Sequence, residues 1–142
     1  MTDDAHGLQR FLDAQEGVHD QALSELRAGR KQSHWMWFVF PQVAGLGRSS
    51  TAQHYAIGSL DKAQAYLEHP VLGTRLVECA RAVLSHRERT AREILGSPDD
   101  LKLRSSVTLF DRVSGADPVF REVLDAFFDG EPDPRTLEIL GL

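Results

Sequence analysis

The sequence predicts an all-α protein, a single compact irregular domain of about seven helices that takes up residues 1–142. Three observations lead to this prediction. Apolar residues recur three and four positions apart along most of the chain, as they do on one face of a helix. Proline follows aspartate or serine at three places that suit the start of a helix. Alternation of apolar and polar residues, the pattern of a strand, never extends beyond a few positions.

The first two predicted helices lie on either side of Gly17. Leu8 and Phe11 share one face of the first helix, and a helical repeat of apolar residues continues over residues 18–28. Gly29 then supplies a stop for the second helix. We therefore expect two short amphipathic helices at this end of the chain.

The next predicted helix begins after Ser59 and ends near His69. Ser59 is placed to cap the first turn through its hydroxyl, and Pro70 ends the helix because proline cannot continue it. An apolar stripe over residues 71–86 predicts the helix that follows. Cys79 lies in that stripe and is expected to be an inert core residue.

A short helix is predicted over residues 91–95, where Gly96 closes it. Pro98, Pro118 and Pro134 then suit the first position of three further helices, because that position has no use for a backbone N–H. These helices complete an all-α chain without a linker or an internal repeat.

Composition restricts the class of protein. Hydrophobic residues make up 42% of the chain and charged residues 26%, which is ordinary for a globular protein, and the net charge of -5 does not favour nucleic acid or membrane surfaces. The single cysteine cannot form an intrachain disulfide and fits a reducing cytoplasm. No signal-peptide pattern occurs, and no apolar run approaches the roughly 20 residues that span a bilayer. We therefore expect a cytoplasmic monomer or small homo-oligomer with no membrane segment.

The stretch between Glu25 and Asp61 contains none of the 21 acidic residues. Local positive charge in an acidic protein favours an anionic ligand, and aromatic rings beside it can stack on a planar group. The sequence GLGRSS, residues 45–50, could offer N–H and hydroxyl groups to a phosphate, although it matches neither a P-loop nor the dinucleotide fingerprint and a surface loop is the plainer interpretation. The basic and aromatic residues of the stretch include Arg27, Arg30, Lys31, His34, Trp35, Trp37, Arg48, His54 and Tyr55.

Residues 33–42, SHWMWFVFPQ, suit either a core or a ligand pocket. Met36, Phe38 and Val39 are expected in the core, because large apolar side chains are usually buried. Trp35 and Trp37 remain open between the two, since a buried indole N–H needs an acceptor.

His34 is the candidate acid–base residue. Its place beside bases and aromatic rings favours partial burial and a neutral imidazole, which could act as a general base or hydrogen-bond a ligand. A structural histidine is the alternative. Neither zinc-ligand spacing nor a nucleophile elbow occurs, so no metal and no serine triad is predicted. Apart from His69 at its helix end, the other histidines are expected at the surface: His6, His19, His54 and His86.

A second unusual stretch is LKLRSSVTLF, residues 101–110, which carries bases and hydroxyls but no acid. Consecutive serines are poor helix formers, because their hydroxyls compete for backbone groups. We consider that Lys102 and Ser105 face the basic aromatic segment. The alternative is a hydroxyl face that is solvated or bonded to its own helix.

Three strings in the chain, KQSHWMWFVFPQVAGLGRS, YAIGSLDKAQAYLEHPVLGTRL and DDLKLRSSVTLF, resemble the domain-of-unknown-function family 1810. Its members are mainly bacterial and are often labelled calpastatin. The resemblance extends from about Leu8 to Leu140, and every motif position is intact. It implies a compact all-α fold and no established reaction. Calpastatin itself acts through disordered repeats, which this chain lacks, so that activity is not predicted.

The first functional hypothesis is a site for an anionic, planar small molecule such as a nucleotide or an ADP-ribose-like compound, with no cofactor and no metal. His34 would be its acid–base group, and the reaction would be a hydrolysis or a group transfer. The candidate ligand-binding residues are Lys31, Arg48, Arg75 and Lys102 for phosphate, Trp35, Trp37 or Tyr55 for stacking, Gln42 and Ser105 for orientation, and Ser33.

The second hypothesis is a non-enzymatic interaction module, in which an exposed Trp35–Phe40 segment binds a partner protein or a second copy of the chain. Nucleic-acid binding is a weaker third, because the stretch between Glu25 and Asp61 holds few bases and the net charge opposes it. Whether the protein is an enzyme stays open at this point.

Overall fold

The structure, a computed structural model, describes residues 6–142, and within that range the chain is all-α, with ten helices and no strand. The expected domain over residues 1–142 therefore includes five residues that lie outside the described part. No helix of that part is long and apolar enough to cross a bilayer. The helices are α1 (Gln9–Gln15), α2 (His19–Arg27), α3 (Met36–Val39), α4 (Ser50–His54), α5 (Leu60–Glu68), α6 (Leu72–Leu84), α7 (Ala91–Leu95), α8 (Asp99–Asp111), α9 (Val119–Phe127) and α10 (Pro134–Leu140).

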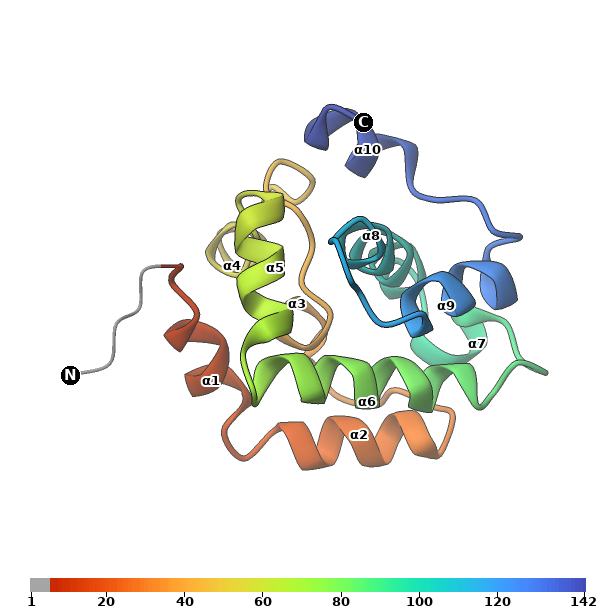
Figure 1. Cartoon of the computed structure of the whole chain (residues 1–142). Helices are drawn as coiled ribbons and strands as arrows, with labels where there is room; N and C mark the ends of the chain where they lie inside the picture. Colours follow the sequence, from red (N-terminus) through yellow and green to blue (C-terminus); the bar gives the residue numbers. More distant parts are fainter. Residues whose placement is uncertain (1–5) are drawn as a thin grey trace.

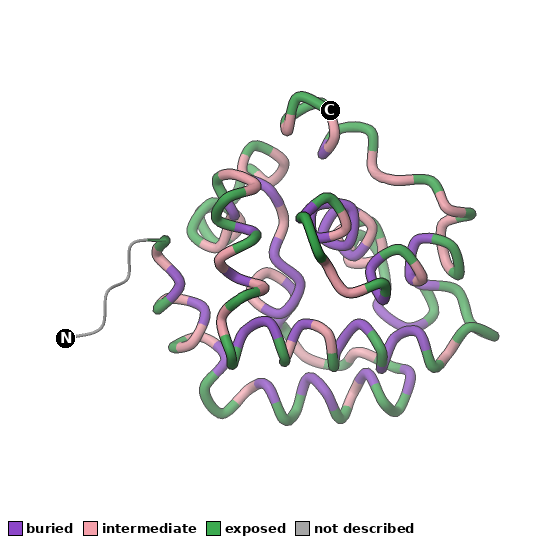
Figure 2. Tube along the Cα trace, viewed as in Figure 1, coloured by how far each residue is buried: buried purple, intermediate pink, exposed green. Residues whose placement is uncertain are grey.

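Helix α8 forms the centre of the fold. It packs against α5, α7, α9 and α10, and these helices surround it in Figure 1. Residues 105–110 are buried without interruption, so most of the α8 tube is purple or pink in Figure 2. A helix surrounded on most sides has no need of a single apolar face, so it can hold buried hydroxyls. Ser105 and Thr108 have hydrogen-bond partners there, whereas the buried Ser106 hydroxyl has none among the described residues.

Helix α6 forms one side of the molecule, with α2 beside it and α5 and α9 packed against it (Figure 1). The apolar stripe predicted for this segment is buried, from Leu72 to Val83. Cys79 lies within it, and burial raises the pKa of its thiol to about 12. The prediction of an inert core cysteine is confirmed.

Local signals place several helix ends correctly. The Ser59 hydroxyl accepts a hydrogen bond from the Lys62 amide at 3.2 Å, as expected of an N-cap. His69 follows the end of α5, and its Nδ1 accepts from the amides of Val71 and Leu72 at 3.1 and 3.2 Å. This histidine therefore ends one helix and satisfies the start of the next.

Each of the three prolines lies at the start of a helix, as predicted, but two of them lie one position earlier than expected. Pro134 takes the first position of α10, as predicted. Pro98 and Pro118 lie one residue earlier than expected, at the N-cap of α8 and α9, so these helices begin at Asp99 and Val119.

Two helices were not predicted, which accounts for most of the difference from about seven. Helix α3 has four residues and α4 has five, too few to display a helical repeat. The chain between them pairs once with the segment after α4, through a parallel bridge of Val43 with Ile57. The stretch between Glu25 and Asp61 therefore contains two short helices and one bridge, and it contributes Trp35, Val43 and Ile57 to the core.

Gly73 lies close to the backbone of α5. A Cβ atom added at this position would collide with the backbone carbonyl of Leu67. Only glycine fits there, because backbone, unlike a flexible side chain, cannot easily move aside.

Candidate functional site

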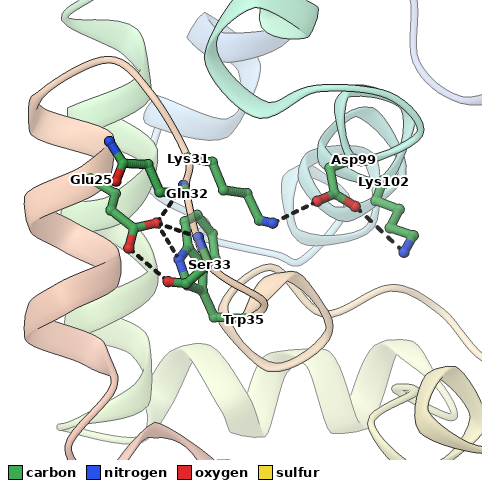
Figure 3. Close-up of polar contacts among 7 residues, drawn as sticks. All are labelled: Glu25, Lys31, Gln32, Ser33, Trp35, Asp99 and Lys102. Carbon is green, nitrogen blue, oxygen red and sulfur yellow. Dashed lines mark hydrogen bonds and ion pairs between the residues drawn. The ribbon is translucent and has the colours of Figure 1, made fainter.

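The structure divides most of the predicted site residues among separate groups of contacts. One group surrounds Asp99, a second surrounds Glu25, and a third surrounds Gln15. The first two meet where Lys31 Nζ lies 5.1 Å from the ring centroid of Trp35, and Figure 3 shows the residues of both groups.

The Asp99 cluster, formed by Lys31, Asp99, Lys102 and Trp37, is the part that brings predicted ligand-binding residues together. Asp99 Oδ2 lies 2.9 Å from Lys31 Nζ, and its Oδ1 lies 3.5 Å from Lys102 Nζ (Figure 3). The Lys102 ammonium also lies 5.0 Å from the ring centroid of Trp37, within the range of a cation–π contact. Two predicted bases thus share a single carboxylate, and one of them also contacts a predicted ring.

Local structure explains how these side chains meet. Asp99 and Lys102 are three positions apart in the first turn of α8, so they lie on one face of the helix. Lys31 comes from the segment after α2, and its backbone amide donates to the carbonyl of Ile94 in α7 at 2.7 Å. That bond fixes the segment against α7 and aims the Lys31 ammonium at Asp99.

Exposure separates the two lysines. Only 9% of the Lys31 side chain is exposed, against 25% for Lys102 and 19% for Asp99. Trp37 is half-buried. Lys31 is therefore a buried partner of Asp99, while Lys102 and Trp37 are the members that a solute can reach.

The Glu25 cluster, formed by Glu25, Gln32, Ser33 and Trp35, holds the same segment from the other side. Glu25 Oε1 accepts from the amides of Gln32 and Ser33 at 2.7 and 3.0 Å and from Trp35 Nε1 at 3.0 Å. Its Oε2 accepts from the Ser33 hydroxyl at 2.6 Å. Burial opposes ionisation, but these hydrogen bonds outweigh it and lower the pKa of Glu25 to about 2.

Burial resolves the two interpretations of SHWMWFVFPQ for most of its residues. Trp35 and Phe40 are fully buried, and Met36 and Val39 nearly so, which confirms the core prediction for the last two. Trp35 therefore presents no ring face to a ligand in this structure, and its indole N–H finds the acceptor that burial requires. The exposed Trp35–Phe40 surface on which the interaction hypothesis depended is absent here, since only Trp37 and Phe38 are partly accessible.

Arg75 and Tyr55 lie outside the Asp99 cluster. Arg75 Nη1 donates to Gln15 Oε1 at 3.2 Å, and Gln15 in turn donates to the Phe38 carbonyl and the Tyr66 hydroxyl at 2.7 and 3.2 Å. Tyr55 packs edge-on against Phe38, with ring centroids 5.3 Å apart. Tyr55 therefore contacts Phe38 directly, and Arg75 is connected to Phe38 through Gln15. No contact of the described chain joins either residue to Asp99.

Ser105 is buried and faces a different partner from the one expected. Its hydroxyl donates to Asp133 Oδ2 at 2.9 Å and also contacts the Leu101 carbonyl at 3.2 Å. Thr108 accepts from the Asp133 amide at 2.9 Å. The hydroxyls of α8 therefore secure the start of α10, and the prediction that Ser105 faces the basic aromatic segment is wrong. Of the alternatives, a solvated face is absent, whereas bonding to the same helix is found, because Ser105 and Thr108 also contact the carbonyls of Leu101 and Arg104.

His34 and Arg48 are exposed. The partial burial expected for His34 is absent, and within residues 6–142 its side chain has no hydrogen bond or ion pair that would fix its tautomer. Arg48 lies in the 43–49 loop, and the Ser49 hydroxyl is used to cap α4 at Ala52 N, 3.1 Å away. Gln42 is half-buried and pairs with Ile57 through its carbonyl, which accepts from the Ile57 amide at 2.8 Å.

The predicted surface position of the other histidines is wrong for one of them. His19 is buried rather than exposed, and its burial, together with Arg75, lowers its pKa against the opposing effect of Glu78. His6 and His54 are exposed, and His86 is partly buried with Nε2 2.8 Å from the Arg27 carbonyl. Among the residues that the structure describes, no group of three or more His, Cys, Asp or Glu side chains could hold a metal ion.

Asp99 and Glu25 are the important residues that the sequence did not indicate as part of a site. Asp99 follows Pro98 at a predicted helix start, and its spacing of three from Lys102 is a usable signal of an ion pair. Glu25 gave no signal of its own, because its partners lie seven to ten residues further along a non-helical segment.

Comparisons with known proteins agree with this fold and supply no activity. The crystal structure of the conserved hypothetical protein Rv1873 from Mycobacterium tuberculosis superimposes with a TM-score of 0.95 at 50% sequence identity, over 98% of this chain and 99% of that one. No curated protein matches the chain. The family model of DUF1810, described as a protein of unknown function, matches residues 5–140. The chain therefore belongs to the DUF1810 family.

Proposed function

We propose that the Asp99 cluster binds an anionic small molecule that carries a planar group, such as a nucleotide or an ADP-ribose-like compound. One observation carries the proposal: a partly exposed ammonium, Lys102, lies above a partly exposed indole, Trp37, and shares its carboxylate partner with a second lysine. A cation beside an accessible ring is the pair of groups that a phosphate attached to a base requires.

The charge balance supports an anionic ligand over a cationic one. Asp99 faces two ammonium groups and cannot neutralise both. Its closer contact is with Lys31, at 2.9 Å against 3.5 Å for Lys102. Asp100 is the next acid, but successive residues of a helix point about 100° apart, so it leaves α8 in another direction. Lys102 therefore retains charge for a ligand.

Binding requires Lys102 to change partners. A cation–π contact at a partly exposed site contributes only about 0.5–1 kcal/mol, and an exposed ion pair contributes no more. A phosphate can therefore draw the ammonium away from the ring, which frees the ring face for a planar group. In this arrangement Lys102 binds the anion, Trp37 stacks, and Lys31 keeps Asp99 occupied. No reaction is assigned, because no hydrogen bond or ion pair among the described residues orients His34.

A thermal-shift screen against nucleotides, ADP-ribose, NAD and phosphorylated metabolites tests the proposal. A ligand at 100 times its Kd should stabilise the protein by about 2.7 kcal/mol, which is a shift of several degrees. Lys102→Met removes the charge and keeps most of the length of the side chain, and it should abolish the shift. Lys62→Met, at an exposed lysine of α5, is the matched control and should leave the shift unchanged.

Fluorescence then locates the ligand. Trp35 is buried and Trp37 is partly exposed, so a ligand at the Asp99 cluster should quench the emission of Trp37, and Trp37→Phe should remove that response. A hit whose affinity survives both Lys102→Met and Trp37→Phe would overturn the proposal, as would the absence of any hit in the screen.

A further inference from the structure

A hollow of about 210 Å³ lies between α5, α6 and the connection from α8 to α9, and none of the predicted site residues lines it. Its apolar wall is formed by Leu67, Val77, Val113 and Ala116. Gln64 and Glu68 of α5 supply polar groups. A small apolar hollow with a few polar groups on one side is the usual form of a small-molecule site.

The polar side of the hollow is negative. Gln64 Nε2 donates to Glu68 Oε1 at 3.0 Å, which orients the carboxylate. Asp117 also lines the hollow, but its charge is met by Arg81 Nη2 at 2.9 Å, and the same oxygen accepts from the Val119 amide. Glu68 differs, because no cation of the described residues pairs with it. One uncompensated carboxylate therefore faces the hollow.

The end of helix α5 adds to this negative charge. Glu68 is the last residue of α5, a helix of nine residues. The carbonyl end of a helix carries a partial negative charge, so a carboxylate there is unfavourable unless a cation lies nearby. A second hollow of about 490 Å³ shares Leu67 and Val77 with the first, and it is lined by one acid, Glu78, and one base, Arg81. The unpaired negative charge therefore lies at Glu68, on the first hollow.

We propose that this hollow binds a small organic cation, a primary ammonium on an apolar body about the size of a phenyl ring. The ammonium would donate to Glu68 and to the carbonyl end of α5, and the apolar body would cover Leu67, Val77 and Ala116. This site is independent of the Asp99 cluster, which takes a ligand of the opposite charge.

Three probes with the same apolar body and different charge test the proposal: 2-phenylethylamine, 2-phenylethanol and phenylacetate. Their binding is followed by amide chemical shifts of the full-length protein labelled with ¹⁵N. The amine should bind most tightly, the alcohol more weakly and the anion least. Shifts should centre on Val77 and Gly115, which line the hollow. Equal affinity for the three probes, or shifts centred on Trp37, would overturn the proposal.

Variants then separate charge from shape. Glu68→Gln keeps the size of an exposed side chain and should weaken amine binding about three- to fivefold, the effect of one surface ion pair. Glu138→Gln, an exposed acid of α10, is the matched control and should leave amine binding unchanged. Ala116→Phe should fill the hollow and abolish binding of all three probes. Amine affinity that survives both Glu68→Gln and Ala116→Phe would place the amine elsewhere and refute the site.

Discussion

Glu25 and Asp99 both anchor the segment from Lys31 to Trp37, but they use different chemistry. Glu25 accepts hydrogen bonds from neutral donors, and those from Gln32, Ser33 and Trp35 fix the turn after α2. Asp99 instead faces two ammonium groups, one of which stays partly exposed. A carboxylate filled by neutral donors stabilises the fold, whereas one that shares excess cations leaves charge for a ligand. Proximity to an aromatic segment alone does not distinguish the two.

The largest effect should follow from removing Glu25. Glu25→Ala leaves the exposed Gln32 amide, the partly buried Ser33 amide and the indole of buried Trp35 without their acceptor. A buried unsatisfied donor costs about 1–3 kcal/mol. We expect a loss of about 3 kcal/mol in the free energy of unfolding, measured by urea denaturation. Glu138→Ala, on the exposed side of α10, should stay within about 0.5 kcal/mol. A loss below about 1 kcal/mol for Glu25→Ala would remove the contrast between the two carboxylates.

The second effect is a dependence of stability on pH. The pKa of Glu25 is lowered from an ordinary 4.5 to about 2, so its contribution is fully present above pH 4.5 and is lost as the pH falls toward 2. We expect the wild type to lose about 2 kcal/mol from this group over that window, a figure reduced for its partial exposure. Glu25→Gln should lack this component, and parallel curves for the two proteins between pH 4.5 and 2 would contradict the assignment.

Asp99→Asn should destabilise the protein less than Glu25→Ala does. It should also strengthen ligand binding, whereas Lys102→Met should weaken it. The variant leaves the largely buried Lys31 ammonium without its ion pair, which we expect to cost about 1–2 kcal/mol in urea denaturation. It also removes the anion that competes with the ligand, so the affinity for a ligand found in the thermal-shift screen should rise about three- to fivefold. Weaker binding in the variant would show that Asp99 positions the ligand instead of competing with it.

The smallest effect should be that of Lys102→Met on stability. Its ion pair and its contact with Trp37 are partly exposed, so the free energy of unfolding should change by less than about 0.5–1 kcal/mol. The emission of Trp37 should change, because the charge above its ring is gone. A loss of stability as large as that of Glu25→Ala would show that Lys102 has a structural role, and it would contradict the proposal that Lys102 is available to a ligand.

Sequence was sufficient where the signal is local. The cap at Ser59, the end of α5 at His69 and the stop at Gly96 depend on a few neighbouring residues, and each is found where expected. Helices α3 and α4 escaped prediction because a segment of four or five residues is too short to show a period, and neither is followed by a glycine as α7 is by Gly96.

The candidate site was only partly predictable, because its charges are balanced across the chain. The stretch between Glu25 and Asp61 is free of acids in sequence but not in space, since Glu25 borders it and Asp99 reaches it from α8. Ser105 shows the same limit, because its partner Asp133 belongs to α10 and no spacing rule connects them. Pairings of this kind arise from tertiary packing, which residue patterns do not encode.

Cys79 gives the protein a natural reporter of its own unfolding. Its thiol is buried in α6, and its pKa is raised to about 12, so the reactive thiolate is almost absent from the native state at neutral pH. A disulfide reagent can modify this single cysteine only during the moments when the core opens. The labelling rate at increasing reagent concentration therefore measures first the opening equilibrium and then the opening rate, without any engineered probe.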